Sequence, residues 1–318
     1  MALRIVYSIG KGGVGKTTCA AALAVQSSRT WRTLVVSLDP AHNLGDVLDT
    51  RLSDSHKKQS ENLWASEIDM EAAIARYLKE SAERLKQMYH YLKVINIEGY
   101  LDALKLSPGI EEYATLQAME ELIREAEQRY EVLVFDTPPT GLTLRVLALP
   151  RISLLWGERL RLLRREILNK RGAIQSIQGE RKFVVDGTEY SLSSDEKSDA
   201  VMKELNEYVS RMQALTSLQA DTARTRVMPV MNADRLSLFE TKRAFSSLKA
   251  LGMPIGSVIV NKIGLKITDS RTVEQIEAEL RCKVRTIPFI QDELFGSSAV
   301  EQFAQHIDFL EWIPGHNE

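Results

Sequence analysis

Apolar runs typical of buried strands alternate with stretches of helical periodicity along most of the chain. Residues 3–9 and 33–38 are apolar and rich in β-branched side chains, and residues 17–28 between them carry alanine, leucine and valine at helical density. Further buried strands are predicted at residues 130–135, 227–231, 257–260 and 284–287. This alternation predicts an α/β fold, with a mostly parallel sheet covered by helices on both faces.

Two regions depart from this alternation. Residues 53–127 hold apolar positions at helical spacing, and we interpret them as a helical annex. Residues 151–225 begin with an apolar helix rich in arginine and contain Asp186-Gly187 between two apolar runs, which predicts a small hairpin. The polar stretch 191–200 is a candidate low-complexity segment. We interpret residues 1–318 as one domain with these two helical excursions.

Charge and cysteine content narrow the class of protein. Lys and Arg number 41 against 43 Asp and Glu, so no global basic field favours nucleic acid, and no specific nucleic-acid partner is expected. Cys19 and Cys282 lie far apart and form no C-x-x-C pair, which argues against a disulfide framework or a zinc cluster within one chain. With neither a signal-peptide pattern nor an apolar run near ~20 residues, we expect a soluble, cytoplasmic protein.

A glycine-rich loop follows the first predicted strand and opens the first predicted helix. It reads Gly10-Lys11-Gly12-Gly13-Val14-Gly15-Lys16-Thr17 and satisfies the phosphate-loop pattern G-x-x-x-x-G-K-[ST]. Backbone N–H groups of such a loop converge on phosphate oxygens, Lys16 neutralises phosphate charge, and the Thr17 hydroxyl is placed to bind Mg²⁺. Residues 10–18, including Thr18, are therefore predicted to bind nucleotide.

An acidic residue beside this loop completes the predicted magnesium site. Asp136 follows the apolar run Val132-Leu133-Val134-Phe135, at the end of a strand where phosphate-loop enzymes place a second acidic residue. We predict that Asp136 helps to hold Mg²⁺ through water. The alternative interpretation is that Asp136 only ends the strand and binds no ligand.

Three segments together resemble one known family. Lys11 directly follows the first glycine of the loop, residues 39–46 read Asp-Pro-Ala-His-Asn-Leu-Gly-Asp, and residues 136–145 begin Asp-Thr-Pro-Pro-Thr-Gly. These segments resemble the two switches and the deviant Walker A loop of the arsenite-pump and tail-anchored-protein-targeting ATPase family. Further matches are Glu67-Ile68-Asp69, Pro108-Gly109-Ile110, Leu238-Phe239-Glu240-Thr241 and Val260-Asn261-Lys262.

The resemblance implies an enzyme that hydrolyses ATP to ADP and phosphate. In this family the additional lysine of the loop, here Lys11, reaches across a homodimer to the partner's phosphates. Asp39 resembles the switch carboxylate that orients the attacking water, so Asp39, Lys11 and Lys16 are the expected catalytic residues. A turn cap beside Pro40 is the alternative role for Asp39.

The residues expected around the base favour adenine over guanine. Asn261-Lys262 stands where related GTPases carry N-K-x-D, but position 264 is glycine, so no carboxylate is available for guanine. Asn261 is expected to pair with the adenine edge, whose N6 and N7 suit an amide. Pro288 and Phe289 lie in a segment similar to the family's adenine-lining stretch; packing in the core is an equally good interpretation of that segment.

Departures from the family pattern bear on cofactors and partners. No cysteine lies between Lys262 and Arg281, where the targeting branch carries a shared zinc site, so no zinc is expected. Residues 151–225 hold only two methionines, where that branch forms a Met-rich groove. Seven apolar positions there either line a client surface or pack on the core: Leu154, Leu155, Trp156, Leu160, Leu163, Ile167 and Leu168. The interleaved Arg159, Arg161, Arg164 and Arg165 are interpreted as a solvated helix face.

The resemblance implies a nucleotide-switched homodimer, and our first interpretation of its output is handling of a hydrophobic client segment or membrane-protein partner, with any membrane association transient and through that partner. Two alternatives stay open. One is the energy-coupling subunit of an arsenite or oxyanion efflux pump, and the other is a positioning or partition-type scaffold ATPase.

Overall fold

The computed structural model describes residues 2–41, 43–88, 104–105, 107–179, 182–185, 188–191, 193–264, 270–291 and 294–316. The chain forms two compact units. The first, here called the sheet unit, comprises Met1–Ala73, Ala114–Leu147 and Ser217–Glu318. The second, the helical unit, comprises Ile74–Tyr113 and Ala148–Thr216.

The sheet unit is built on one mostly parallel sheet. Its strand order in the described residues is β10-β9-β8-β1-β5-β2-β4-β3, and the β3–β4 pair alone among its pairings is antiparallel. This confirms the predicted α/β fold. The strands are β1 (Arg4–Ile9), β2 (Thr33–Ser37), β3 (Lys57–Lys58), β4 (Leu63–Glu67), β5 (Val132–Asp136), β8 (Thr225–Asn232), β9 (Val258–Ile263) and β10 (Val284–Pro288).

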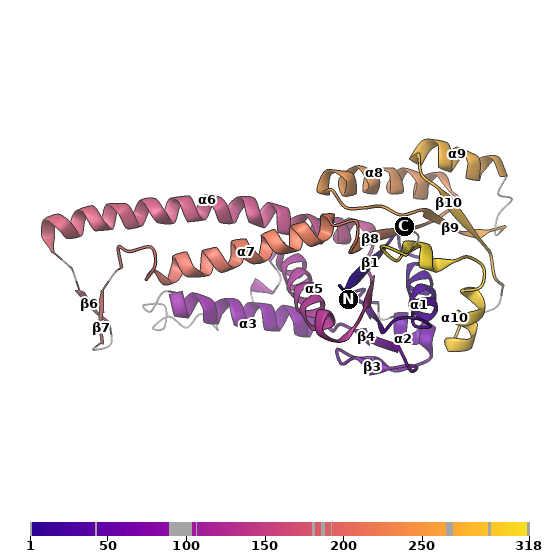
Figure 1. Ribbon diagram of the computed structural model, residues 1–318, viewed down its shortest axis with the longest axis horizontal. Helices are drawn as coiled ribbons and strands as arrows, with labels where there is room; N and C mark the ends of the chain where they lie inside the picture. The colour runs from indigo at the N-terminus through magenta and orange to yellow at the C-terminus, as the bar shows by residue number, and fades with distance from the viewer. Residues whose placement is uncertain are drawn as a thin grey trace. The chain divides into compact units, whose positions relative to one another are not determined.

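Among the described residues, helices pack on this sheet through two apolar clusters described here. One cluster joins the alanine-rich α1 to the sheet, α2, α10 and the 3₁₀ helix η2, and the other joins α8 and α9 to β8 and β9. Figure 1 shows α8 and α9 together beside β9 and β10. The helices are α1 (Lys16–Ser27), α2 (Asn43–Leu48), α8 (Arg235–Leu251), α9 (Ser270–Leu280), α10 (Ser297–Phe303) and η2 (Phe309–Trp312).

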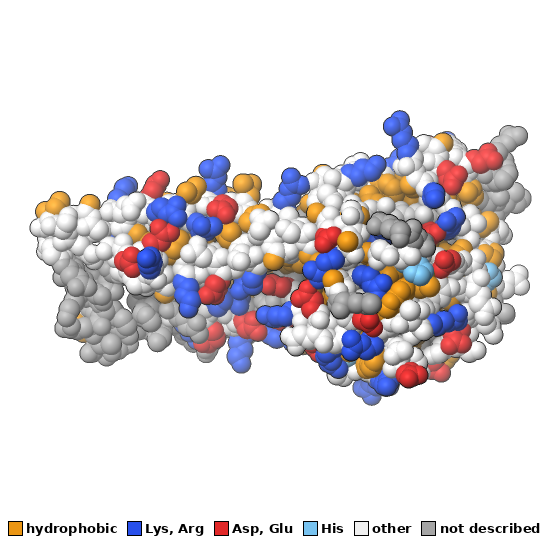
Figure 2. Space-filling model, in the orientation of Figure 1, with side chains coloured by type: hydrophobic (Ala, Val, Ile, Leu, Met, Phe, Trp, Pro, Cys, Tyr) orange, Lys and Arg blue, Asp and Glu red, His pale blue; other side chains and the backbone are white. Residues whose placement is uncertain are grey.

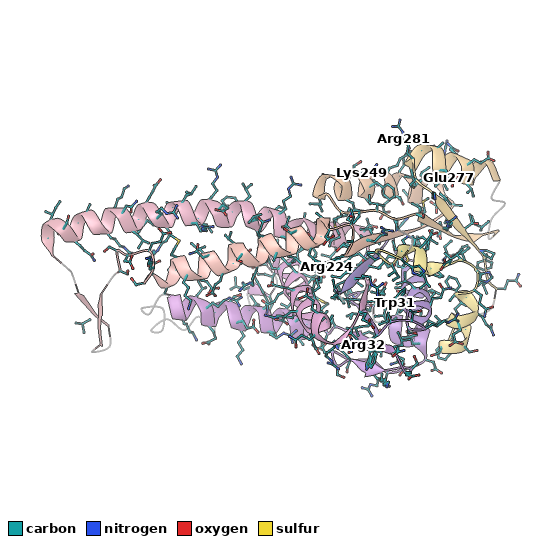
Figure 3. All side chains as sticks on the ribbon, in the orientation of Figure 1. Trp31, Arg32, Arg224, Lys249, Glu277 and Arg281 are labelled. Carbon is teal, nitrogen blue, oxygen red and sulfur yellow. The ribbon has the colours of Figure 1, made fainter. Side chains whose placement is uncertain are left out.

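Arginine residues make contacts at the amino ends of β1, β2 and β8. Arg32 N donates to Glu131 Oε2 at 3.0 Å, and the Arg224 guanidinium donates to Glu127 Oε1 at 2.7 Å. The Arg4 guanidinium lies 4.2 Å from the ring centroid of Trp31. Figure 3 labels Trp31, Arg32 and Arg224 in this part of the sheet unit. The glycine-rich loop lies at the opposite edge, because it follows the carboxyl end of β1.

In its described residues, the helical unit contains parts of four helices and a small hairpin. The elements are α3 (Met70–Met88), α5 (Ile110–Arg129), α6 (Thr140–Gln178), α7 (Ala200–Ala220), and the hairpin strands β6 (Lys182–Val185) and β7 (Thr188–Ser191). The four helices extend from one unit into the other. Strands β6 and β7 pair antiparallel, which confirms the predicted hairpin; its Asp186-Gly187 turn lies outside the described residues.

Two neighbouring arginines of α6 form ion pairs with acidic residues of the segment before α7. Arg164 forms a bidentate pair with Asp199 at 2.9 and 2.7 Å, and Arg165 forms one with Glu196 at 3.1 and 2.9 Å. The prediction of a solvated face is therefore wrong for Arg164, whose side chain is only 12% exposed. On the face that Figure 2 shows, Lys and Arg alternate with Asp and Glu along α6.

Two further features differ from the sequence predictions, in the ranges 53–127 and 151–225. The range 53–127 contains β3 and β4, strands that helical spacing did not reveal, because Leu63-Trp64-Ala65-Ser66-Glu67 is short and mixed in polarity. The helix predicted from residue 151 begins at Thr140. The single-domain interpretation of 1–318 stays a prediction. No described helix is long and apolar enough to cross a membrane.

Candidate functional site

The loop between β1 and α1 needs three of its glycines, for two separate reasons. Gly13 and Gly15 have φ of 77° and 96°, in the region where side chains are strained. A Cβ on Gly15 would lie 2.3 Å from Asn261 Nδ2, and one on Gly10 would lie 2.2 Å from Val230 O. Helix α1 begins directly after the loop at Lys16, so the unpaired N–H groups of its first turn lie at the loop.

The carboxyl ends of β2 and β5 bring two polar side chains to this loop. Ser37 and Asp136 are paired in register, and both are buried. Asp136 Oδ2 accepts hydrogen bonds from Thr17 Oγ1 at 2.9 Å and Ser37 Oγ at 3.0 Å, whereas Asp136 Oδ1 has no partner in the structure. Burial raises the pKa of Asp136 to about 6, against the hydrogen bond from Thr17 and the charge of Lys16.

A cavity of about 500 Å³ opens beside the loop. It brings together most of the residues that the sequence singled out: Gly12, Gly13, Gly15, Lys16, Thr17, Thr18, Asp39, Asn261, Pro288 and Phe289. Val14 and Asp136 are not on its wall. Gly10 and Lys11 line a different, much smaller pocket, together with Ser237, Glu240 and Thr241 of α8.

Asp39 follows β2 and lies on the cavity wall. Its backbone N–H donates to Ser37 Oγ at 3.3 Å, and its Oδ1 accepts from Ala41 N at 3.1 Å. The carboxylate thus does cap the turn at Pro40, which the sequence offered as its alternative role. One capping bond leaves the other lone pairs of a carboxylate available, so the cap and a role toward water are compatible.

Asn261 and Lys262 hold the loop from β9. Asn261 Nδ2 donates to Val14 O at 2.9 Å, and its Oδ1 accepts from Lys262 N at 2.8 Å. Lys262 Nζ donates to Gly13 O at 2.8 Å. A primary amide has two donors and two lone pairs, so each end of Asn261 keeps capacity for one more bond. The two side chains are struts of the glycine loop as well as cavity residues.

Sequence reasoning missed two of these contacts. Ser37 was read only as part of a strand, because its bond to Asp136 depends on a register between segments 99 residues apart. Lys262 was read only as the partner of Asn261 in a short motif. Lys262 has a positive φ of 58°, which is unusual for lysine. No sequence signal indicates this backbone conformation or the bond of Lys262 to the loop.

The two cysteines differ in their exposure to solvent. Cys19 is buried in α1, where burial raises the pKa of its thiol far above the usual range. Cys282 is partly exposed, and burial is the largest cause of its raised pKa. In the described part of the chain, no group of three or more His, Cys, Asp and Glu side chains is arranged to hold a metal ion.

A parallel sheet, a glycine loop between β1 and α1, and a buried aspartate at the end of β5 define an α/β phosphate-loop NTPase fold. The chain belongs to the anion-transporting ATPase family, whose sequence model matches residues 3–308.

Three relatives cover most of the chain. Arsenical pump-driving ATPase 2, as it is named in Aquifex aeolicus, is 27% identical over 96% of this chain and 99% of its own length. A protein of Entamoeba histolytica named as an ATPase ASNA1 homolog is 30% identical over 82% of this chain and 76% of its own length. The ATPase get3 of Aspergillus niger is 28% identical over 95% and 89%.

Proposed function

We propose that this protein is a Mg²⁺-dependent ATPase that closes as a homodimer around nucleotide and couples that closure to binding of a hydrophobic protein segment. The observation that carries the proposal is the cavity at the carboxyl edge of the sheet. Glycine-loop residues, Lys16, Thr17 and Asp39 all line it, and Asp136 lies directly behind Thr17.

Thr17 and Asp136 fit a magnesium ion. The Asp136 Oδ1 oxygen is buried and has no partner among the residues that the structure describes, which is costly unless a cation or its water occupies the position. Thr17 Oγ1 donates a hydrogen bond to Asp136 Oδ2, so the hydroxyl and the carboxylate lie next to each other. When bound with the phosphates of ATP, Mg²⁺ supplies charge neutralisation at the phosphate oxygens. Phosphates and waters provide its remaining ligands.

The other residues bind and orient the reactants. Backbone N–H groups of residues 12–18 and the Lys16 ammonium bind the phosphates. Asp39 orients the attacking water by accepting its hydrogen bond. Asn261 contacts the adenine edge with its remaining donor and lone pair, and Pro288 and Phe289 contact the base from the cavity wall.

Lys11 acts in the partner's site in this proposal. Its place outside the lining of the larger cavity supports a role elsewhere than at its own chain's phosphates. In the homodimer, the Lys11 ammonium of one chain stabilises charge on the phosphates bound by the other.

The helical unit supplies the client surface. Leu155, Leu163 and Ile167 on α6 are 63%, 54% and 36% exposed, whereas Leu168 is 2% exposed and belongs to the core. Exposed apolar side chains at positions 155, 163 and 167 of one helix are suited to bury a partner helix. The resemblance to the targeting branch is the second support for this role.

Coupling to oxyanion efflux is the second candidate, because relatives that match most of the chain are named for arsenical pump driving. The two cysteines give it little support. A trivalent metalloid prefers three soft ligands, and Cys19 is enclosed in the core.

Asp39→Asn tests the hydrolytic part of the proposal. The variant is expected to bind ATP as the parent does and to hydrolyse it roughly a hundredfold more slowly in a single turnover, because one water-positioning group is lost. Lys16→Ala, the matched control, is expected to lose binding itself. Single-turnover hydrolysis by Asp39→Asn within about tenfold of the parent would contradict the role of Asp39.

Mixed dimers test the position of Lys11. If Lys11 acts in trans, equal amounts of Lys11→Ala and Asp39→Asn chains should recover about a quarter of the parental rate. Half of the dimers are then mixed, and each holds one complete site. A lysine that acts in its own chain leaves every site defective. No recovery, with mixed dimers shown to form, would contradict the trans role.

A further inference from the structure

Glu67 is a buried acidic residue that the proposed chemistry does not use. It ends β4 and is paired in register with Ser37 of β2, which is itself in register with Asp136 of β5. Glu67 is only 7% exposed. A carboxylate buried at this edge of the sheet needs hydrogen-bond donors to offset its desolvation.

One of its donors belongs to the segment that carries Asp39. Gly45 N donates to Glu67 Oε1 at 2.8 Å, and Gly45 lies in α2, which begins four residues after Asp39. The carbonyl of Gly45 accepts from Thr50 N at 2.9 Å. Gly45 is thus held on both its N–H and its C=O sides.

Close packing makes this attachment specific. A Cβ on Gly45 would lie 2.7 Å from Thr50 O and 3.4 Å from Glu67 Oε2, so no larger residue fits without displacement. The backbone of Glu67 is fixed too, because its N–H donates to Ser53 O at 3.0 Å. The carboxylate therefore reaches α2 from a residue whose own backbone is held by the sheet and by Ser53.

Helix α2 in turn forms part of the cavity wall. Asn43 and Val47 line the cavity together with Asp39 and Ala41, while Leu44 and Leu48 are buried in the core beneath. A shift of α2 consequently moves the segment that ends at Asp39. Misplacement of a catalytic group by about 1 Å can cost roughly a hundredfold in rate.

We propose that Glu67 is a positioning residue for ATP hydrolysis: by holding Gly45 N it fixes α2 and thereby the placement of Asp39. Glu67 does not touch the nucleotide; it acts through the backbone of α2. The inference rests on the proposed ATPase activity. It predicts that loss of the Glu67–Gly45 bond lowers the rate of hydrolysis and leaves ATP affinity unchanged.

Three substitutions at position 67 separate acceptor geometry from charge. Glu67→Ala removes the acceptor and is expected to slow single-turnover hydrolysis about tenfold or more at unchanged Kd for ATP. Glu67→Gln keeps an oxygen at the same reach, so it should restore the rate to within about threefold of the parent. Glu67→Asp keeps the charge but is one methylene shorter, so it should resemble Glu67→Ala.

Two further variants complete the experiment. Gly45→Ala disturbs the same contact from the other side and should reproduce the slow rate with Glu67 intact. Glu61→Ala, an exposed glutamate before the same strand, is the matched control and should behave as the parent. Melting temperatures identify any variant that fails to fold, and the comparison of Glu67→Gln with Glu67→Asp then decides.

The outcomes distinguish this inference from the proposed function. If the parent hydrolyses ATP and Glu67→Ala keeps its rate, or loses affinity in parallel with rate, the positioning role is wrong and the ATPase stands. A good rate for Glu67→Asp with a poor one for Glu67→Gln overturns it as well, because charge would then matter more than reach. A parent that does not hydrolyse ATP overturns both.

Discussion

Asp136 in the sheet unit and Asp199 in the helical unit are both buried carboxylates, 0% and 5% exposed, in very different surroundings. Asp199 accepts two hydrogen bonds from Arg164 and one from Met202 N. Asp136 accepts two bonds on Oδ2 and none on Oδ1. The first carboxylate is satisfied by the protein, and the second keeps an unused oxygen beside the glycine loop.

The pKa values of the two groups shift in opposite directions, because their hydrogen bonds offset burial to different extents. Burial raises the pKa of both; for Asp136 the bond from Thr17 does not compensate, and the pKa reaches about 6. For Asp199 the bonds from Arg164 and Met202 outweigh burial and hold the pKa below its usual range. This difference fits the proposed roles, in which Asp136 holds a ligand and Asp199 is structural.

The largest expected effect comes from Asp136→Asn. Removing the charge should slow Mg²⁺-dependent single-turnover hydrolysis roughly a hundredfold or more, since several kcal/mol of charge stabilisation is lost. It should not lower the melting temperature of the nucleotide-free protein, because the buried charge lacked full compensation. Thermal melting without nucleotide checks the second part, and a melting temperature well below the parent's would show that Asp136 is a structural group.

The exposed face of α6 gives the next largest effect. Replacing Leu155, Leu163 and Ile167 by Ser should weaken ATP-dependent capture of a hydrophobic-helix peptide at least tenfold, since a fully buried Leu contributes about 1.5–3 kcal/mol. The melting temperature should stay near the parent's, because these side chains are already exposed. Leu168→Ser, on the same helix but buried, should instead lower it.

Leu236→Ser is the matched control for exposure alone, since Leu236 is 58% exposed on α8 of the sheet unit. It should leave capture unchanged. Unchanged capture by the folded α6 triple variant contradicts the client surface. Severalfold stimulation of hydrolysis by arsenite, abolished by Cys19→Ala with Cys282→Ala, would favour the efflux alternative.

The sheet unit was more predictable from sequence than the helical unit, and local chemistry explains why. The glycine loop, Asp39 and Asp136 stand at strand ends, where a few consecutive residues determine both the turn and the chemistry. Six strands of the sheet were predicted because each is a short apolar run. Strand β4 was missed, since Ala65, Ser66 and Glu67 give it little strand character.

Contacts between distant segments account for what the sequence did not reveal. The pairing of Arg164 with Asp199 spans 35 residues, and the polar stretch that holds Asp199 has no periodic pattern. The bond from Gly45 to Glu67 likewise depends on how α2 packs against the end of β4, across 22 residues. Composition alone cannot distinguish a solvated arginine from a paired one, because both lie on a polar helix face.

A third expected effect concerns the struts of the glycine loop. Asn261→Ala removes a buried bond to Val14 O and the amide proposed to contact adenine, so ATP affinity should fall about tenfold. The preference for ATP over GTP should fall with it. Lys262→Ala is the control, because it removes a bond to Gly13 O without removing the amide.

Competition binding of ATP and GTP at matched Mg²⁺ separates the two roles. Lys262→Ala should weaken both nucleotides equally, whereas Asn261→Ala should weaken ATP more than GTP. If the parent itself binds the two nucleotides equally, Asn261 is a strut of the loop and does not read the base.

The smallest expected effect is on stability, and it lies in the helical unit. Asp199→Asn loses charge-assisted bonds to Arg164 and should lower the free energy of unfolding by about 1–3 kcal/mol at neutral pH. Because the pKa of Asp199 is lower in the folded than in the unfolded protein, its stabilisation is present above the unfolded value of about 3.9 and is lost as pH falls through the folded value. Urea unfolding at about pH 7, 5 and 3 should therefore show the difference in unfolding free energy between parent and variant at the first two values and a smaller difference at the third.

Glu196→Gln, which breaks the exposed pair with Arg165, is the control. It should change the free energy of unfolding little at any pH, because solvent screens that pair. For Asp199→Asn, a difference of equal size at all three pH values would mean that the hydrogen-bond geometry of Asp199, and not its charge, carries the stabilisation.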